Sequence, residues 1–287
     1  MRYSVIDEQS REYPVRPLCR LLNVSASGYY AWRKRPTGCH SQENERLVSA
    51  MREIHRTIDS SYGSPRMHAE LVSRGYACGR HRVARLMRGN GLIAKTTVRF
   101  RSLTKAGRRD AAAANLLDRR FMVAAPNQVW ASDITYIPTA EGHIYLAVVL
   151  DLYSRQVVGW AMTARLGTEL VTTALRQAIK RRPIKPGLLH HSDRDGLYNS
   201  AGYKRLLVRY GMISSMSRKG NCYDNACVES FFARLKTELV AFERFKSRDE
   251  ARQKLFIWIE TFYNRVRRHS SLGYKSPVEY EDRNKHA

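Results

Sequence analysis

The sequence predicts an α/β fold in which helices flank a mixed sheet, with a helical region before it. Apolar residues recur at helical spacing up to residue 92, and runs rich in β-branched and aromatic residues begin at residue 128. Beyond residue 128 the elements are expected in the order β-β-β-α-β-α-β-α. Three meandering strands followed by alternation build a sheet with both antiparallel and parallel neighbours.

The composition favours a polyanionic partner. The chain has 287 residues, with 50 Lys and Arg against 26 Asp and Glu, and a formal net charge of +24. A surface this basic attracts nucleic acid first and an anionic membrane second. No apolar run is long enough to span a bilayer, and no basic amphipathic helix stands out, so a membrane is disfavoured. The length allows two or three small domains that each bury a core.

Cysteine usage and the N-terminus indicate an intracellular protein. The cysteines form no CxxC pair and show no zinc-binding spacing with histidine, so we expect free thiols in a reducing compartment. Residues 1–13 lack the apolar core of a signal peptide. The cysteines are Cys19, Cys39, Cys78, Cys222 and Cys227.

The region before residue 92 is predicted to form short helices. Residues 14–35 give two, and the pattern suits a helix-turn-helix and any helical hairpin with a basic end about equally. Residues 44–58 give one longer helix. Within residues 61–92, Ser64 is expected to cap a helix that stops at Gly75, and a second helix follows.

That second helix is the stronger candidate for reading DNA. Its apolar residues are expected to face inward and its arginines outward, where they can reach phosphates or guanine edges. A solvated basic face is the alternative for any one of them. The arginines are Arg80, Arg82, Arg85 and Arg88.

The α/β part follows a stretch at 99–125 that is expected to be a linker with some helix, ending at Pro126-Asn127. Strands are expected at 128–138, 143–154, 155–162, 187–193 and 212–217. Helices are expected at 168–182, 200–211, 224–240 and 248–266, followed by a turn-rich tail at 268–281.

Three acidic residues stand where this topology could bring them together. Asp133 lies in the first strand, Asp193 ends the fourth, and Glu229 lies early in the helix from residue 224. The first and fourth strands can be neighbours, and open sheets build sites at strand ends. Three converging carboxylates would repel one another, whereas two divalent cations would turn them into ligands. Hard oxygen donors suit Mg²⁺ or Mn²⁺.

These residues lie in stretches that resemble the DDE-type integrase-core transposases of bacterial insertion sequences, specifically the OrfB catalytic subunit. The resemblance covers residues 125–282 and rests on five stretches in the family's order. They are "NQVWASDITYI", "YLAVVLDLYSRQVVGW", "HHSDRDGLYNS", "SRKGNCYDNACVESFFARLKTEL" and "YNRVRRHSSLGYKSPVEY". The unit "YGSPRMHAELVSRG" resembles the helix-turn-helix that precedes the core in these proteins.

The resemblance implies an RNase-H-like fold of the retroviral integrase superfamily and a catalytic triad. The aspartate after His-Ser is Asp193, so the triad would be Asp133, Asp193 and Glu229, holding about two Mg²⁺ or Mn²⁺ ions. The 35 residues between Asp193 and Glu229 match the family's spacing, and so does Lys236, seven residues after Glu229 and implied to contact DNA. The implied activity is metal-dependent cleavage and strand transfer at element ends.

The resemblance also implies partners and a domain order. The partners would be the terminal inverted repeats, target DNA, further copies on paired ends, and an OrfA protein or frameshift fusion, in the bacterial cytoplasm at the nucleoid. No membrane partner is expected. The expected domains are a DNA-binding region at 1–98, the linker, a catalytic core at 126–240, and a C-terminal helix and tail at 241–287.

The stretch after Asp193 departs from the family's Asp-Arg-Gly-x-Gln-Tyr, with Asp195 at the glycine and Leu197 at the glutamine. Because of this departure, a second function remains an alternative: a DNA-binding regulator with a decayed catalytic core. A nuclease that cuts without joining is a further alternative. Asp195 is expected to have a surface role rather than to bind metal.

Other acidic residues receive structural roles. Asp151 is expected either to support the residues of the site or to be structural at a strand end, since Arg155 is near it in sequence. Asp224 and Asn225 are expected to cap the helix that follows them. Glu238, nine residues after Glu229, is expected to project away from it.

Overall fold

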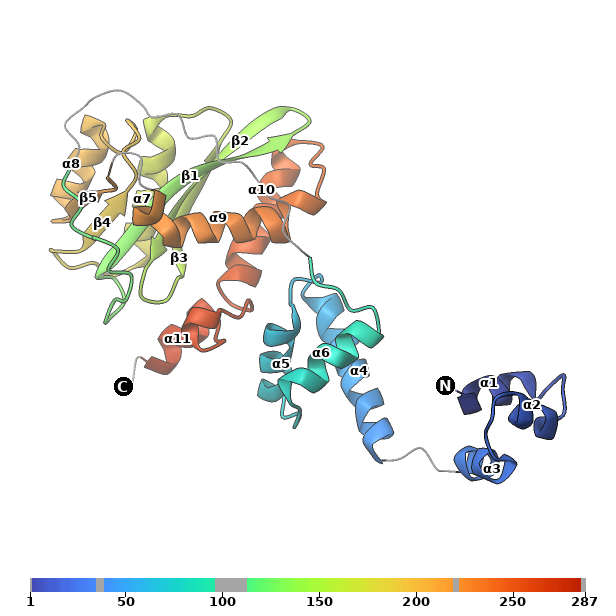
Figure 1. Ribbon diagram of the computed structural model, residues 1–287. Coiled ribbons are helices and arrows are strands. Elements are labelled where there is room, and N and C mark those ends of the chain that lie inside the picture. The colour runs from blue at the N-terminus through green and yellow to red at the C-terminus, as the bar shows by residue number, and fades with distance from the viewer. Residues whose placement is uncertain (1, 35–38, 96–112, 219–221, 285–287) are drawn as a thin grey trace.

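The computed structural model describes residues 2–34, 39–95, 113–218 and 222–284 (Figure 1). It confirms the predicted mixed sheet, which has five strands in the order β3-β2-β1-β4-β5. The first three strands pair antiparallel, and β4 and β5 continue the sheet in parallel beside β1. The strands are β1 (Val129–Thr139), β2 (Gly142–Asp151), β3 (Val157–Thr163), β4 (Leu189–Ser192) and β5 (Ile213–Met216).

Helices cover both faces of this sheet, because alternate strand residues are apolar on each side. Trp130, Val149 and Val158 pack under α7 and α8. Ala131 and Val148 face the other way and pack under α9, α10 and the π-helix η3. These elements are α7 (Thr168–Arg181), α8 (Ala201–Arg209), α9 (Ala226–Glu238), α10 (Arg248–Phe256) and η3 (Ile257–Tyr263). Short 3-10 turns and one helix complete this part: η1 (Cys222–Asn225), η2 (Val240–Phe242), η4 (Ser270–Leu272) and α11 (Pro277–Asn284).

The first three helices form a small unit that lies apart from the sheet in Figure 1. Ile6, Cys19 and Tyr29, one from each helix, make its buried centre. The two helices predicted within residues 14–35 are present, and the sequence did not predict the helix before them. The three are α1 (Arg2–Gln9), α2 (Val15–Leu21) and α3 (Ala26–Lys34).

The next three helices form the second helical unit, with Met51, Ile54, Met67 and Val83 in its core. They are α4 (Cys39–Thr57), α5 (Ser64–Ser73) and α6 (Arg80–Gly89). The prediction that Ser64 caps α5 is wrong, since Gly63 occupies that position and makes no side-chain cap. The predicted stop at Gly75 is confirmed, because this residue adopts φ +86°, which suits glycine.

The C-terminal segment is not merely a turn-rich tail. It contains α11, and the chain just before η4 forms hydrogen bonds with the α4–α6 unit. The Tyr62 hydroxyl donates to Val266 O (3.1 Å) and accepts from Arg268 N (2.9 Å). Arg268 Nε donates to Glu70 Oε2 at 2.6 Å. These contacts join residues about 200 positions apart in sequence, which no local pattern could predict.

The described part of the predicted linker, residues 113–125, contains no helix; residues 99–112 lie outside the described ranges. It packs against the sheet edge beside β5. The N–H groups of Leu116 and Leu117 donate to Ser215 Oγ at 2.9 and 3.2 Å, and Leu117 is buried in the core under α9.

The described residues bear on two expectations, that the cysteines are free thiols and that no segment spans a membrane. Cys19, Cys78 and Cys227 are free thiols, while the side chains of Cys39 and Cys222 are not described. No helix in the ranges that the structure describes is long and apolar enough to cross a membrane.

Candidate active site

Asp133 and Asp193 lie side by side on two neighbouring parallel strands, Asp133 within β1 and Asp193 directly after β4. The register pairs Ser132 of β1 with Ser192 of β4, so each aspartate is the next residue along its strand direction. Side chains two residues apart share a face of a sheet. Ala131 and Leu189 pack into the core under α9, so Asp133 and Asp193 also face α9. The topology thus brings together two acids that are 60 residues apart in sequence.

Glu229 comes to the same side of the sheet from the first turn of α9. Val228, Phe231 and Leu235 of this helix are buried against the sheet, which fixes the orientation of α9. Glu229 itself is exposed, yet its charge reaches Asp133 and helps to raise the pKa of that carboxyl. The third predicted acid is therefore within electrostatic reach of Asp133.

The two aspartates lie in an environment that disfavours negative charge. Burial is the main cause that raises the pKa of Asp133 well above its ordinary value, and the charge of Asp193 is the next. Burial likewise raises the pKa of Asp193 to about 6. Partial burial of its carboxyl raises the pKa of Glu229. A cation bound between these carboxylates would offset the repulsion among their negative charges.

Lys236 lies on the Glu229 face of α9, as the seven-residue spacing predicts. Its ammonium stands over the ring of Tyr136, 5.7 Å from the centroid. Burial lowers the pKa of Lys236, and the nearby charge of Asp133 opposes that shift. The lysine is therefore within electrostatic reach of Asp133.

The donor set suits a hard divalent cation, because it consists of carboxylates. Asp133 and Asp193 are adjacent, and burial, together with neighbouring negative charge, raises the pKa of each. Within the described ranges, however, no three His, Cys, Asp or Glu side chains are grouped closely enough to hold a metal ion. The two aspartates fit a cation, and Glu229 would have to move toward them to complete its coordination.

Asp195 occupies the family's glycine position without strain. It is not among the residues with positive φ, so the backbone here does not require glycine. Its N–H donates to Asp193 Oδ1 (3.1 Å), and its own Oδ1 accepts from Leu197 N (3.0 Å). Asp195 therefore shapes the turn after β4, and its negative charge contributes to the raised pKa of Asp133 and Asp193.

The capping roles predicted for Asp224 and Asn225 are wrong. Asn225 occupies the cap position of α9 but makes no side-chain cap, and its amide donates to Ser132 O at 3.2 Å. The carboxylate of Asp224 accepts from Arg218 N (2.9 Å) and Arg119 Nε (3.1 Å). Burial works to raise the pKa of Asp224, but these hydrogen bonds outweigh it and hold the pKa below its ordinary value. Both residues tie the start of α9 to the sheet.

Two further acids have structural surroundings. Asp151 is fully buried at the end of β2, as expected, but its carboxylate accepts from the N–H groups of Asn127 and Tyr153. The predicted neighbour Arg155 instead donates to Cys227 Sγ. Glu238 is buried in an ion pair with Arg267.

The α6 arginines divide into two groups. Arg85 and Arg88 are exposed, as predicted. Arg82 turns back to α4, where it donates to Asn44 Oδ1 (2.8 Å) and Glu43 Oε2 (3.0 Å). Arg80 is exposed, and its guanidinium lies 3.5 Å from the hydroxyl of Tyr274. The prediction that all four point away from the protein is wrong for Arg82.

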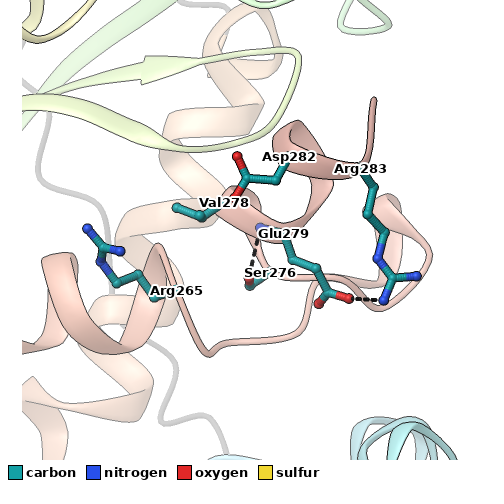
Figure 2. Close-up of a pocket in the computed structure, with 6 residues that line it drawn as sticks. All are labelled: Arg265, Ser276, Val278, Glu279, Asp282 and Arg283. Atoms are coloured by element: carbon teal, nitrogen blue, oxygen red, sulfur yellow. Dashed lines mark hydrogen bonds and ion pairs between the residues drawn. The ribbon is translucent and has the colours of Figure 1, made fainter. Parts of the chain in front are cut away.

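A separate hollow of about 560 Å³ lies between the end of η3 and α11 (Figure 2). It contains none of the predicted site residues. Its rim carries an ion pair between Glu279 and Arg283, with oxygen and nitrogen 2.8 Å apart. Its lining residues are Arg265, Ser276, Val278, Glu279, Asp282 and Arg283.

Comparison with known proteins gives two family matches. Integrase core domain models match residues 123–222 and 210–277, and an HTH-like domain model matches residues 42–100. The chain is 41% identical over 286 residues to "Transposase InsF for insertion sequence IS3A" of Escherichia coli, covering 99% of both chains. It is also 41% identical over 266 residues to an "Insertion element IS600 uncharacterized 31 kDa protein" of Shigella sonnei, covering 93% of this chain and 98% of that one. Among solved structures it is similar to the HTLV-2 integrase catalytic core domain in complex with magnesium, with 16% identity, a TM-score of 0.42, and coverage of 55% of this chain and 97% of that one.

Proposed function

This chain belongs to the family of insertion-sequence transposases with an integrase core, and on that premise we propose that Asp133, Asp193 and Glu229 carry its catalytic chemistry. The chain is a transposase of the IS3 family that acts in DNA transposition. The observation that supports the assignment is the pairing of β1 with β4, which sets Asp133 beside Asp193 on the α9 side of the sheet.

The proposed reaction is phosphodiester cleavage and strand transfer at the element ends. Asp133, Asp193 and Glu229 would hold divalent cations, Mg²⁺ or Mn²⁺ and about two of them, as in two-metal sites that process phosphate esters. Such cations, when bound, activate a water or a 3′-hydroxyl and stabilise the departing oxygen. Lys236 would contact a DNA phosphate beside the carboxylates, where its ammonium offsets the negative charge of the target.

The same carboxylates can serve both cleavage and joining, because only the nucleophile changes between a water and a freed 3′-hydroxyl. No covalent protein–DNA intermediate is needed, so none of the 16 tyrosines is required as a nucleophile.

The proposed partners are the element's terminal inverted repeats and target DNA. The exposed Arg85 and Arg88 of α6 support a role for the α4–α6 unit in holding DNA, together with the net charge of +24. We further propose that copies of the chain assemble on paired ends with an OrfA partner, and that they act in the cytoplasm at the nucleoid. The proposed domain boundaries are those expected from the sequence, at residues 98, 125 and 240.

One assay separates this proposal from its alternatives. A labelled element end is incubated with plasmid and the protein, with Mg²⁺ and again with a chelator. Mg²⁺-dependent joining supports the transposase reaction. Binding without cutting supports a regulator with a decayed core, and cutting without joining supports a nuclease. Chelation is expected to abolish cutting and joining while DNA binding persists, and activity that survives chelation contradicts the proposal.

The assignment of Asp193 is tested by Asp193→Asn. The amide keeps the shape of the side chain but removes the charge, so cutting is expected to be lost while affinity for DNA stays close to that of the unaltered protein. The matched control is Asp249→Asn, since Asp249 is an exposed aspartate of α10 that forms an ion pair with Arg252 of the same helix. If both variants cut DNA equally well, the assignment of Asp193 to the catalytic site is wrong.

A further inference from the structure

Basic side chains from three separate parts of the chain meet where the α4–α6 unit touches the catalytic core. We call this set the junction cluster: Arg66 of α5, Arg234 of α9, and Arg267 and His269 from the turn before η4. Arg66 Nε donates to Arg268 O at 2.9 Å, which places α5 against that turn. Arg267 forms an ion pair with Glu238 of α9, which places the turn against α9.

The positive charges in the cluster act on one another. The pKa of Arg66 is lowered to about 10, chiefly by burial and also by the charges of Arg267 and Arg234, while the charge of Glu238 acts in the opposite direction. Burial lowers the pKa of His269 well below its ordinary value, and the positive charges of nearby arginines act in the same direction: Arg267, Arg66, Arg155 and Arg234. Like charges gathered in a partly buried place destabilise one another unless an anion joins them.

Among the described residues, Glu238 is the acid that forms an ion pair with a member of the cluster. Glu238 is 4% exposed, and both of its oxygens are taken by Arg267, at 2.7 and 2.5 Å. Among the described residues no acidic side chain forms an ion pair with Arg66 or Arg234. Arg234 is exposed to solvent, while Arg66 is half-buried. Two cationic groups therefore remain without a negative partner.

His269 adds a second and independent sign of an incomplete site. Its side chain is 9% exposed, and its Nε2 has no hydrogen-bond partner in the described part of the chain. A buried polar atom left without a partner costs about 1–3 kcal/mol. The ring packs edge-on against Tyr263, with centroids 4.9 Å apart, and this contact helps to hold the imidazole in place.

We propose that the junction cluster binds a backbone phosphate of the DNA, between the part held by the α4–α6 unit and the part at the carboxylates. A phosphate oxygen accepts from arginine in the fork geometry of the guanidinium and supplies the missing negative charge. Arg234 lies five residues after Glu229 on α9, well round the helix from it. A helix is about 10 Å across with its side chains, so one DNA strand can meet both sides of α9.

This inference rests on DNA being the substrate of the carboxylate site, and it assigns residues outside that site. It gives α9 two roles: Glu229 and Lys236 on one side of the helix act at the reacting phosphate, and Arg234 on another side holds a second phosphate. Because Arg66 belongs to α5, the bound phosphate would also strengthen the contact between the helical unit and the core.

The test compares two arginine-to-glutamine variants. Arg234→Gln removes an exposed member of the cluster, and Arg176→Gln is the matched control on α7, an exposed arginine on the opposite face of the sheet. Binding to a duplex with the element's own terminal sequence is measured over a range of salt concentrations. Loss of one phosphate contact is expected to weaken binding about tenfold and to reduce the slope of log K against log salt by about 0.9. Arg176→Gln is expected to leave the slope unchanged.

The position of the phosphate is then found with duplexes that carry a neutral methylphosphonate at one position at a time. At one position the neutral group should weaken binding of the unaltered protein but have no further effect on Arg234→Gln. Equal slopes for the two variants, or the absence of such a coupled position, would overturn the inference. The proposed function fails separately: joining activity that does not depend on Asp193 would contradict it. That outcome would leave the result of the binding experiment unchanged.

Discussion

Asp151 has no exposed surface, and two backbone N–H groups rather than a cation hold its carboxylate. Burial raises the pKa of Asp151 to about 6, from an ordinary value of 3.8. The charge of Glu281 acts in the same direction, and Arg182 opposes it. A single residue thus couples the folding of the core to pH, without any part in the chemistry of the site.

The folded state holds the Asp151 proton more tightly than the unfolded state, so this group's contribution to stability is full below pH 4 and is lost as the pH rises through about 6. Asp151→Asn removes that titration. The free energy of unfolding of the variant, relative to the unaltered protein, should therefore increase by up to about 3 kcal/mol between pH 4 and pH 7. Urea unfolding at several pH values measures it, and two parallel stability curves would contradict the assignment.

Single residues also show which predictions about the site could be made from the local sequence and which depend on residues far away in the chain. Asp133 and Asp193 were predicted because one acid lies in a recognisable strand and the other ends one, and the register places them together. Asp224 was assigned a cap, since its position before a helix suits one. It bonds Arg119 and Arg218 N instead, and Arg119 lies 105 residues away, which its neighbours in sequence do not reveal.

At the scale of elements, α7 packs so closely on β3 that only glycine fits at one point of contact. A side-chain Cβ at Gly159 would overlap the carbonyl oxygen of Ala174 and lie 2.7 Å from the Cβ of Ala178. These are atoms of the facing helix α7, and its backbone cannot rotate away as a flexible side chain could. Gly159 therefore sets the distance between the helix and the sheet.

Gly159→Ala is expected to destabilise the core by about 1–3 kcal/mol, because the helix must shift to admit the methyl group. The control is Gly202→Ala in α8, where the nearest atom would be a methyl carbon of Thr168 at 4.0 Å. That change should be neutral or slightly stabilising, since alanine favours helix. Thermal unfolding of the two variants measures the difference, and an equal effect at both positions would show that α7 does not pack this closely.

A second element-scale contact ties α9 to the C-terminal segment through Glu238 and Arg267. Both side chains are almost fully buried, so removing one partner leaves the other as an uncompensated charge. Arg267→Met should lower the free energy of unfolding by about 3–5 kcal/mol. The double variant with Glu238→Leu should recover most of that loss, because two apolar groups replace the pair. Denaturant unfolding measures the cycle, and additive losses would show that the two charges do not interact.

At the scale of the whole molecule, the chain is built from units joined to different degrees. The α4–α6 unit is joined to the core by hydrogen bonds from Tyr62, Arg66 and Arg268. The α1–α3 unit has its own apolar cluster, made only of residues before position 30. Its ion pair between Arg33 and Asp7 is also internal.

Deletion of residues 1–38 is therefore expected to leave the rest of the protein folded, with its thermal midpoint nearly unchanged, because the larger cores contain none of the deleted residues. Differential scanning calorimetry of the shortened and full chains measures this. A large fall in the midpoint of the remaining transition would show that the first unit stabilises the others.

The sequence by itself determined the classes and order of the elements, because apolar periodicity is a property of neighbouring residues. It also pointed to the acids in and after the strands, since strand position follows from the same pattern. Only the tertiary structure decided which distant residues meet: the packing of the C-terminal segment under the α4–α6 unit, the partners of Asp224, and the gathering of Arg66, Arg234 and His269. Such contacts depend on how whole faces pack together, and no short stretch of sequence records that.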